Sequence, residues 1–348
     1  MQHSWPEVLS GLVRGVDLSV ESATWAMGEI LAGNATPVQI AGFAVALRTK
    51  GETVEELTGL AEAMLDAATV LRIDGNAVDV VGSGGDRANT VNVSTMAAIV
   101  AAGAGARVVK HGNRAASSAC GTADCLEALG VALDVAPSAQ ASVLASSGIV
   151  FLFAPLYHPA LRHAGAARRE LGIPTTFNFL GPLANPARPA AQAVGVADLR
   201  VAQLVAGVLA RRGTRGLVFH GDDGLDELTT TTSSDIWLIS DAEAIHSRLD
   251  PEALGLEPAA PEDLRGGGPD FNAAVVRAVL DGQTGPVRDI VVLNAAAALL
   301  AFQGPEPHRP RGPQLRPHLE AAAEAIDSGA ARATLEHWVA ASQATPRA

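Results

Sequence analysis

The stretch "VVKHGNRAASSACGTAD", residues 108–124, gathers hydrogen-bond donors in the middle of an apolar chain. The donor side chains are those of Lys110, His111, Asn113, Arg114, Ser117 and Ser118. The whole chain has 25 Lys and Arg against 37 Asp and Glu, a formal net charge of −12, which repels anions at long range. An anionic ligand therefore needs a site that is built locally, and these donors indicate one. The alternative is a basic turn that water solvates.

A second donor-rich loop is "DVVGSGGDRANTVNVST", residues 79–95. Its glycines permit positive φ and remove side chains, so that successive backbone N–H groups can converge on phosphate oxygens. Asn92, Ser94 and Thr95 add donors where a helix is expected to begin, and a helix N-terminus itself attracts anions. The spacing is neither G-x-G-x-x-G nor a Walker A motif, which disfavours a dinucleotide or a nucleoside triphosphate. Two such loops in one domain predict an extended, phosphate-bearing ligand between them.

Carboxylates are concentrated in "HGDDGLDELTTTT", residues 220–232, which contains Asp222, Asp223, Asp226 and Glu227. An isolated acidic loop is usually solvated surface. Carboxylates that face a phosphate site need cations between them, and Mg²⁺ is commonly held by one or two carboxylates together with phosphates and water. This loop therefore predicts a magnesium site.

A fourth segment, "HPALRHAGAARRELG", residues 158–172, carries Arg162, His163, Arg168 and Arg169 on one expected helix. Some of these arginines must be solvated. One that turns inward can bind a carboxylate through a bidentate pair of hydrogen bonds.

The hydrophobic pattern predicts the elements that position these loops. Residues 1–70 show helical spacing only, with an N-cap at Thr36-Pro37 and a capping box from Thr53 to Glu56. From residue 77 onward, the β-branched runs "AVDVVG", "RVVKH", "GIVFLFA", "AVGVAD" and "RGLVFHG" alternate with helical stretches. We therefore expect an α/β protein, in which a small helical domain joins a larger domain with a central, mainly parallel sheet flanked by helices. The tail is expected to be helical, with residues 304–318 as an exposed loop.

The composition excludes several classes of partner. A net charge of −12 opposes binding to a nucleic-acid backbone or to an anionic membrane. We find no signal peptide and no uninterrupted apolar run of ~18 residues, so we expect no membrane span. Cys120 and Cys125 fit neither a zinc knuckle nor a disulfide framework, and we expect them to be small buried residues of a reduced protein. These features predict a soluble, cytoplasmic protein.

Four motifs, in order along nearly the whole chain, resemble those of the anthranilate phosphoribosyltransferases. They are "GSGGDRANTVNVST", "KHGNRAASSACGTAD", "HPALRHAGAARRELG…FNFLGPLANP" and "HGDDGLDELT". The resemblance implies transfer of a phosphoribosyl group from 5-phosphoribosyl 1-diphosphate (PRPP) to the amine of anthranilate, with release of pyrophosphate, in tryptophan biosynthesis. It implies Mg²⁺, two ions per subunit, and a homodimer formed through the helical domain. It implies a nucleoside phosphorylase-like fold, with a helical domain of residues 1–72, completed by helices around 158–190, and a PRPP-binding α/β domain of residues 73–348.

The resemblance also implies roles for residues at matching positions. PRPP would contact Gly82, Gly85, Asp86, Thr90, Asn92, Val93, Ser94, Thr95, Lys110, His111, Gly112, Asn113, Arg114, Ser117, Ser118 and Thr122. Anthranilate would contact Gly82, Asn113 and Arg168, with His111 and His158 nearby. Magnesium would be held by Ser94, Asp226 and Glu227. Lys110, Asn113 and Arg168 would be the catalytic residues, in a mechanism based on positioning and electrostatics rather than on acid–base groups.

Two residues depart from the family pattern. Ser83 stands where threonine is common, and Arg87 stands where a small residue is common, which adds a cation beside the diphosphate loop. An alternative function is that of a pyrimidine nucleoside phosphorylase, which shares the fold and a similar lysine–serine loop. The acidic pair at 226–227 and Arg168 argue against it. A non-enzymatic paralogue that binds nucleic acid is a further alternative, and the net charge opposes it.

Overall fold

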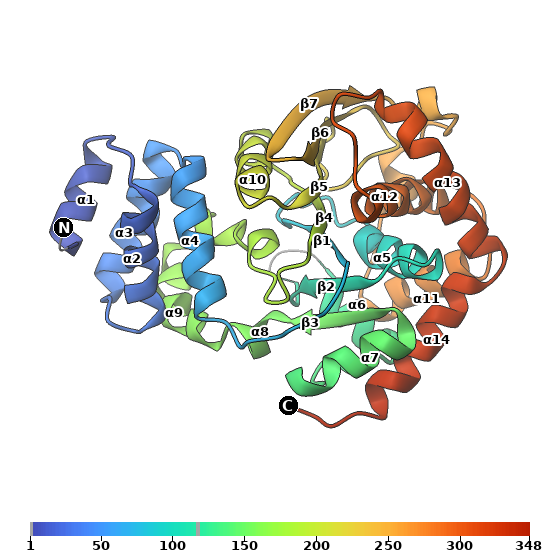
Figure 1. Cartoon of the computed structure of the whole chain (residues 1–348), viewed down its shortest axis with the longest axis horizontal. Coiled ribbons are helices and arrows are strands. Elements are labelled where there is room, and N and C mark those ends of the chain that lie inside the picture. The colour runs from blue at the N-terminus through green and yellow to red at the C-terminus, as the bar shows by residue number, and fades with distance from the viewer. Residues whose placement is uncertain (1–2, 116–118) are drawn as a thin grey trace.

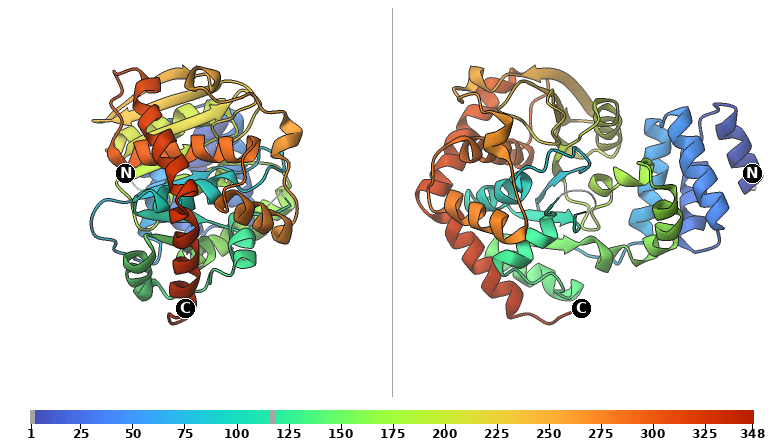
Figure 2. Two further views of the ribbon diagram at one scale, coloured as in Figure 1. Left: turned by 90° about the vertical axis from the view of Figure 1, so that its right-hand side faces the viewer. Right: turned by 180° about the vertical axis from the view of Figure 1, so that it is seen from behind.

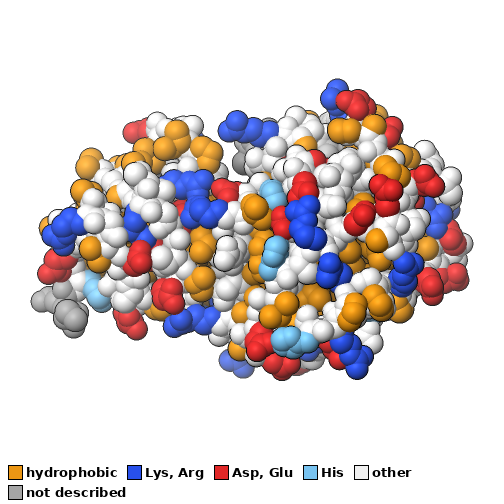
Figure 3. Space-filling model, turned by 90° about the horizontal axis from the view of Figure 1, so that it is seen from above, with side chains coloured by type: hydrophobic (Ala, Val, Ile, Leu, Met, Phe, Trp, Pro, Cys, Tyr) orange, Lys and Arg blue, Asp and Glu red, His pale blue; other side chains and the backbone are white. Residues whose placement is uncertain are grey.

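The computed structural model describes residues 3–115 and 119–348 and consists of two lobes (Figure 1). Ser117 and Ser118 lie outside the described residues. The small lobe is built from α1 (Trp5–Val13), α2 (Val20–Leu31), α3 (Pro37–Lys50), α4 (Val54–Asp66) and α9 (Arg162–Leu171), whereas the short helix α8 (Ala154–Tyr157) places Tyr157 in the core of the large lobe. In the space-filling view the outline narrows between the lobes, and Lys and Arg side chains lie on both sides of this boundary (Figure 3).

Local sequence signals fix the helix ends of the small lobe as expected. Thr36 accepts a hydrogen bond from the backbone N–H of Gln39, and Thr53 accepts one from that of Glu56, each within a reciprocal capping box. Gly51 ends α3 with φ of +89°, a conformation that side chains disfavour. The helices are therefore bounded by their own sequence before they pack.

The large lobe contains a seven-stranded sheet in the order β3-β2-β1-β4-β5-β6-β7. Its strands are β1 (Val78–Gly82), β2 (Val108–Gly112), β3 (Ile149–Phe153), β4 (Ala191–Gly195), β5 (Arg215–Gly221), β6 (Ser234–Ser240) and β7 (Glu243–Leu249). The pairs among β1 to β5 are parallel, so their carboxyl ends lie at one edge of the sheet. The fold class expected from the sequence is confirmed.

Helices cover both faces of the sheet. The helices of the large lobe are α5 (Val93–Gly103), α6 (Thr122–Leu129), α7 (Gln140–Ser147), α10 (Leu199–Arg211), α11 (Pro269–Leu280), α12 (Pro286–Gln303), α13 (Arg311–Asp327) and α14 (Ala330–Gln343). Short 3-10 turns are η1 (Pro137–Ala139), η2 (Pro159–Leu161), η3 (Thr176–Asn178), η4 (Gly181–Leu183), η5 (Glu252–Leu254) and η6 (Pro261–Leu264). Helices α13 and α14 lie on the side away from the small lobe in both figures (Figures 1 and 2).

The two faces of the sheet belong to two apolar cores. On β1, Val80 packs into the core that contains α5 and α12, whereas Val81 packs into the core of the small lobe and α10. Alternate residues of a strand point to opposite faces, so one strand serves both cores. The core of the small lobe thus continues onto one face of the sheet, and Phe177 and Leu180 of the 172–190 crossover belong to it.

Two expectations need correction. Strands β6 and β7 form an antiparallel hairpin at one edge of the sheet that was not among the expected strands; β6 is almost entirely buried, but β7 carries Glu243, His246 and Arg248 and so has no continuous apolar run. Residues 304–318 are not a single loop, since α13 begins at Arg311 and contains Pro317. Pro313 lies in the first turn of α13, where backbone N–H groups have no intrahelical partner, so a proline is tolerated there.

One described helix, α12, is long and apolar enough to cross a membrane. Every residue from Ile290 to Ala301 is buried, and the helix packs between α5, α13 and strands β4 and β5. It is a core helix of the large lobe.

Candidate active site

The carboxyl edge of the sheet brings the acidic loop onto the glycine loop. The backbone N–H of Gly84 donates to Oδ2 of Asp226 at 2.7 Å, and that of Ser94 donates to Oε1 of Glu227 at 3.1 Å. Ser94 is in the first turn of α5, so the Glu227 carboxylate lies at the positive end of that helix. Both acidic side chains are buried, unlike those of an ordinary solvated acidic loop. The two distant motifs therefore form one site.

Burial makes the ionised forms of this acidic pair costly. It raises the pKa of Asp226 to about 7, and the negative charge of nearby Asp86 adds to the effect. The pKa of Glu227 is also raised, first by burial and then by the charge of Asp226, while Lys110 opposes the rise. A group of carboxylates held together in this way favours a cation among them.

Two glycines let the acidic loop approach the strands. A Cβ on Gly82 would lie 2.3 Å from Oδ2 of Asp226, and a Cβ on Gly195 would lie 1.7 Å from the backbone oxygen of the same residue. Neither distance is physically possible, so a side chain at either position would displace Asp226. Gly195, at the end of β4, was missed by the sequence reasoning, and the "AVGVAD" motif gave no signal for it.

Lys110 lies on β2 and is almost completely buried. Its Nζ donates to the backbone oxygen of Val80 and to Oγ of Ser94, the latter at 3.2 Å. Burial lowers the pKa of Lys110, whereas the charges of Asp79, Glu227 and Asp226 oppose that shift. Lys110 and Glu227 thus both contact Ser94, the lysine at its hydroxyl and the carboxylate at its backbone N–H.

Three further residues that were predicted to contact PRPP lie at the start of α5. Asn92 is its N-cap residue; its Nδ2 donates to the backbone oxygen of Cys120 and its Oδ1 accepts from Asn272 at 2.8 Å. Val93 is buried, and Thr95 is buried with no hydrogen-bond partner for Oγ1 among the described residues. Asn92 therefore joins the two donor-rich loops.

The glycine loop itself has an unusual backbone. Gly84 and Gly85 have φ of +70° and +88°, as expected for a loop that turns its N–H groups inward. Arg87 and Asn89 also have positive φ, +60° and +52°. Asparagine tolerates this region, but for arginine it is uncommon.

The second donor-rich loop is held by α6. Asp124 accepts from the backbone N–H groups of Ala115 and Gly121, and Arg114 forms ion pairs with Asp124 at 2.8 Å and Glu127 at 2.9 Å. The guanidinium of Arg114 also lies 5.7 Å from the ring centre of Phe153. In this structure Arg114 is thus occupied by carboxylates of its own domain. The other predicted residues here lie at the end of β2 (Gly112), directly after it (Asn113) and at the start of α6 (Thr122).

His111 and His158 form a T-shaped pair with ring centres 5.3 Å apart. His111 Nδ1 contacts the backbone oxygen of Gly181, and His158 Nε2 contacts that of Ala184, so each of these nitrogens carries a proton. Burial lowers the pKa of His111 to about 3, helped by His158, and burial lowers that of His158. Both rings are therefore neutral, and Nε2 of His111 is a buried acceptor with no partner among the described residues.

Arg168 is the inward-facing arginine of α9. It is partly buried, which lowers its pKa, whereas Arg162 and Arg169 are exposed. Its guanidinium lies 5.5 Å from the ring centre of Phe177. Arg168 forms no ion pair with a carboxylate of the described residues, so it can bind one from a ligand.

Two buried side chains that were not predicted from the sequence, Asp79 and Asn294, form hydrogen bonds that hold parts of the site in place. Asp79 accepts from the backbone N–H of His111 at 3.1 Å and from Asn185 Nδ2 at 2.9 Å. Asn294 of α12 forms paired hydrogen bonds with the backbone of Leu228, directly after the acidic pair. A lone Asp in an apolar strand is the signal that would have found Asp79.

The acidic pair fits Mg²⁺. Within residues 3–115 and 119–348, no group of three or more His, Cys, Asp or Glu side chains is arranged to hold a metal by itself. Asp226, Glu227 and the hydroxyl of Ser94 offer hard oxygen ligands, and water and ligand phosphates would complete the coordination. Magnesium is commonly bound by few carboxylates and several other oxygens, so the site suits this ion.

The chain is similar to known proteins over nearly its whole length. Residues 6–68 match the helical bundle domain of a glycosyl transferase family, and residues 74–332 match the a/b domain of that family. The chain is 57% identical to the anthranilate phosphoribosyltransferase of Thermobifida fusca over 99% of this chain and 98% of the relative. It is 59% identical to that of Acidothermus cellulolyticus, over 98% and 96% of the two chains. The chain belongs to the anthranilate phosphoribosyltransferase family.

Solved structures of anthranilate phosphoribosyltransferases share the whole architecture. The enzyme of Thermus thermophilus has a TM-score of 0.89 and 41% identity, and the match covers 97% of this chain and 99% of that one. The enzyme of Saccharomyces cerevisiae in complex with PRPP and Mg has a TM-score of 0.88 and 28% identity, covering 97% and 98%. Membership in the anthranilate phosphoribosyltransferase family decides against the phosphorylase and the nucleic-acid-binding alternatives.

Proposed function

We propose that this chain transfers the phosphoribosyl group of PRPP to the amine of anthranilate and releases pyrophosphate, with Mg²⁺ bound at two positions per subunit. The contact of Asp226 and Glu227 with the glycine loop and the start of α5 carries the proposal. Carboxylates and phosphate-binding donors face each other there, and a diphosphate with magnesium complements both. The PRPP and Mg complex of the related yeast enzyme supports the same substrate and ion.

The phosphorylated substrate would lie between the two donor-rich loops. Backbone N–H groups of the glycine loop, the hydroxyl groups at the start of α5 and Lys110 would bind its phosphates. Asp226, Glu227 and Ser94 would hold magnesium against the diphosphate. Arg114 would join them by leaving its ion pairs with Asp124 and Glu127, of which the exposed pair with Glu127 is replaced at modest cost. Ser117 and Ser118 remain predicted PRPP contacts.

Anthranilate would bind with its carboxylate on Arg168 and its amine near Asn113 and His111. The ring of Phe177 lies against one face of the Arg168 guanidinium. The opposite face and the edges of the guanidinium therefore remain for a ligand. The unpartnered Nε2 of His111 can accept a hydrogen bond from the amine. His158 would hold the His111 ring in place through the T-shaped contact.

The reaction breaks the bond between C1 of the ribose and the diphosphate oxygen, and forms one between C1 and the amine nitrogen. Bound Mg²⁺ would neutralise charge on the diphosphate. Lys110 and the amides of the glycine loop would stabilise the negative charge that develops on the leaving pyrophosphate. Arg168 would orient the amine for attack from the opposite face. The amine proton would pass to water, because His111, with a pKa of about 3, accepts a hydrogen bond but does not retain a proton.

The small lobe would form a homodimer. Four valines on and next to α1 and α3 have exposed side chains: Val13 at 78%, Val16 at 52%, Val38 at 81% and Val45 at 38%. Val38 and Val45 are seven residues apart on α3 and so lie on one face of it. An apolar face of this kind favours a partner surface, and a second copy supplies the same one. We also assign the enzyme to the cytoplasm, where tryptophan biosynthesis would supply its substrates.

Anthranilate fluorescence tests the proposal. We expect the signal to fall only when PRPP, Mg²⁺ and enzyme are all present, and to stay constant when any one is omitted. Phosphorolysis of uridine or thymidine with inorganic phosphate, without loss of anthranilate, would overturn it.

A further inference from the structure

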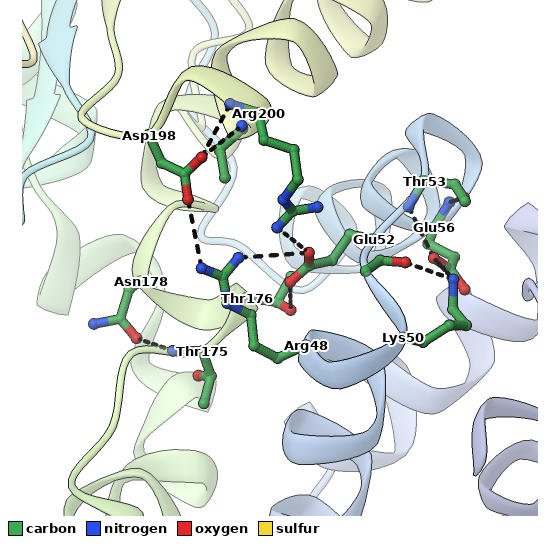
Figure 4. A network of polar contacts seen from close by, with 12 residues as sticks. Arg48, Lys50, Glu52, Thr53, Glu56, Thr175, Thr176, Asn178, Asp198 and Arg200 are labelled. Atoms are coloured by element: carbon green, nitrogen blue, oxygen red, sulfur yellow. Dashed lines mark hydrogen bonds and ion pairs between the residues drawn. The ribbon is translucent and has the colours of Figure 1, made fainter. Parts of the chain in front are cut away.

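Glu52 is a buried carboxylate at the junction of the two lobes. It lies between α3 and α4, and its side chain is completely inaccessible to solvent. It accepts a hydrogen bond of 2.6 Å from Arg200 and one of 2.7 Å from Oγ1 of Thr176, and Arg48 approaches it at 3.7 Å (Figure 4). A carboxylate this deeply buried requires hydrogen-bond and ion-pair partners, and these three residues supply them.

The three partners come from different parts of the fold. Arg48 belongs to α3 of the small lobe, and Arg200 belongs to α10 of the large lobe. Thr176 begins η3 in the crossover that returns the chain to β4. Arg48 also reaches Asp198, the N-cap of α10, at 3.4 Å (Figure 4). One carboxylate thus joins a helix of each lobe to the crossover.

The contact with Thr176 leads directly to the proposed anthranilate site. Thr176 is buried, and the next residue, Phe177, lies against the guanidinium of Arg168 at 5.5 Å. Thr175 and Asn178 close the turn around them through a 3.0 Å hydrogen bond. No described carboxylate pairs with Arg168, and the ring of Phe177 lies against its guanidinium.

We propose that Glu52 is a positioning residue for anthranilate binding: by holding the hydroxyl of Thr176 it fixes Phe177, and with it the guanidinium of Arg168. This rests on the proposed function, in which Arg168 binds the anthranilate carboxylate. The ion pairs of Glu52 with Arg48 and Arg200 hold the carboxylate itself in place. Those two arginines are 34% and 43% exposed, so water can solvate them when a pair is lost.

The test separates the hydroxyl contact from the ion pairs. Thr176→Val removes the hydroxyl in an isosteric side chain, and Thr176→Ser keeps it. One lost hydrogen bond corresponds to about a three- to tenfold change, so Thr176→Val should raise the anthranilate KM by that factor and Glu52→Ala by at least as much, while the PRPP KM stays the same. Thr176→Ser should restore the wild-type KM. Arg200→Gln removes one of the two ion pairs that anchor Glu52 but leaves Arg48 and the bond to Thr176, so it should raise the anthranilate KM less than Thr176→Val does.

Combination with Arg168→Ala distinguishes this inference from the proposed function. If Glu52 acts through Arg168, Thr176→Val has no further effect on the anthranilate KM in that background. An effect that is the same in both backgrounds, or an unchanged KM in folded Thr176→Val, would overturn the inference while the role of Arg168 stands. An unchanged KM in Arg168→Ala alone would overturn both. If Glu52→Ala does not fold, Thr176→Val with its serine control decides.

Discussion

The backbone N–H of Gly84 donates a 2.7 Å hydrogen bond to the carboxylate of Asp226, 142 residues further along the chain. The bond places the acidic loop on the glycine loop at the point where β1 ends. Asp226 and Glu227 are therefore held by backbone groups whose positions the sheet determines. The proposed magnesium site is a property of the fold rather than of one mobile loop.

Removal of the charges of the acidic pair should weaken magnesium binding. Asp226→Asn with Glu227→Gln keeps the volume of both side chains but removes their charges. A charge-assisted contact is worth roughly 1.5–3 kcal/mol, so the Mg²⁺ concentration for half-maximal activity should rise about 10- to 100-fold. A magnesium titration of the folded variant measures this, with Asp222→Asn as a control because Asp222 pairs with Arg248. Unchanged magnesium dependence would refute the assignment.

Replacement of Arg168 should weaken anthranilate binding selectively. Loss of a charge-assisted bond to a carboxylate corresponds to an anthranilate KM about one to two orders of magnitude higher, with little change for PRPP. Steady-state kinetics with each substrate varied in turn measure the split. Arg169→Ala, on the exposed face of the same helix, should leave both constants unchanged. Equal behaviour of the two variants would show that Arg168 is only a solvated helix residue.

Unlike replacement of Arg168, Lys110→Met should weaken the binding of PRPP, because the predicted partner of Lys110 is the phosphorylated substrate. The PRPP KM should rise and the anthranilate KM should change little. Lys50, the other lysine of the chain, pairs with Asp17 and Glu56 in the small lobe. Lys50→Met should lower Tm and leave both KM values intact, which separates a structural loss from a loss of binding.

An added methyl group at Gly195 should displace Asp226 and so disrupt the acidic pair. Its Cβ would overlap the backbone of Asp226, and overpacking of this kind costs about 1–3 kcal/mol of stability. Gly195→Ala should therefore lower both Tm and the affinity for Mg²⁺. A methyl group at Gly28 of α2 would meet no neighbouring element within 4 Å, so Gly28→Ala should preserve both. A fully active Gly195→Ala enzyme would contradict the described packing of the acidic loop.

A charge on the apolar face of α3 should separate the proposed dimer. Val38→Lys places a cation at a position that is 81% exposed in the single chain and would be buried between two copies. Sedimentation equilibrium at micromolar concentration should show a dimer for the wild type and a shift to monomer for this variant. Val70→Lys, at a site of 78% exposure outside α1 and α3, is the matched control. A wild type that is monomeric and active would contradict the dimer.

The sequence was sufficient for those parts of the site that depend on local chemistry. Glycines before a helix start, the N-cap at Thr36, the capping box at Thr53 and an acidic pair after a strand each have a local signature, and the structure has the expected elements at each. Parallel strands then bring their carboxyl ends together, so the neighbourhood of the loops followed as well. The two buried cysteines, Cys120 and Cys125, are also as expected.

Other features depend on tertiary packing and had no local signature. Asn185 meets Asp79 across 106 residues, and Glu52 meets Arg200 across 148. The pairing of Arg114 with Glu127 depends on how α6 folds back on its own loop, which the run of donors does not reveal. The β6–β7 hairpin was not predicted because β7 contains Glu243, His246 and Arg248 and therefore lacks a continuous apolar run.

The proposed reaction joins the ribose of PRPP to the nitrogen of anthranilate. The most direct measurement is the stoichiometry of the reaction, with pyrophosphate release and anthranilate loss followed together and the product weighed by mass spectrometry. We expect one pyrophosphate for each anthranilate consumed, and a product whose mass is that of anthranilate plus one phosphoribosyl group less one hydrogen. Release of pyrophosphate with anthranilate left unchanged would contradict it.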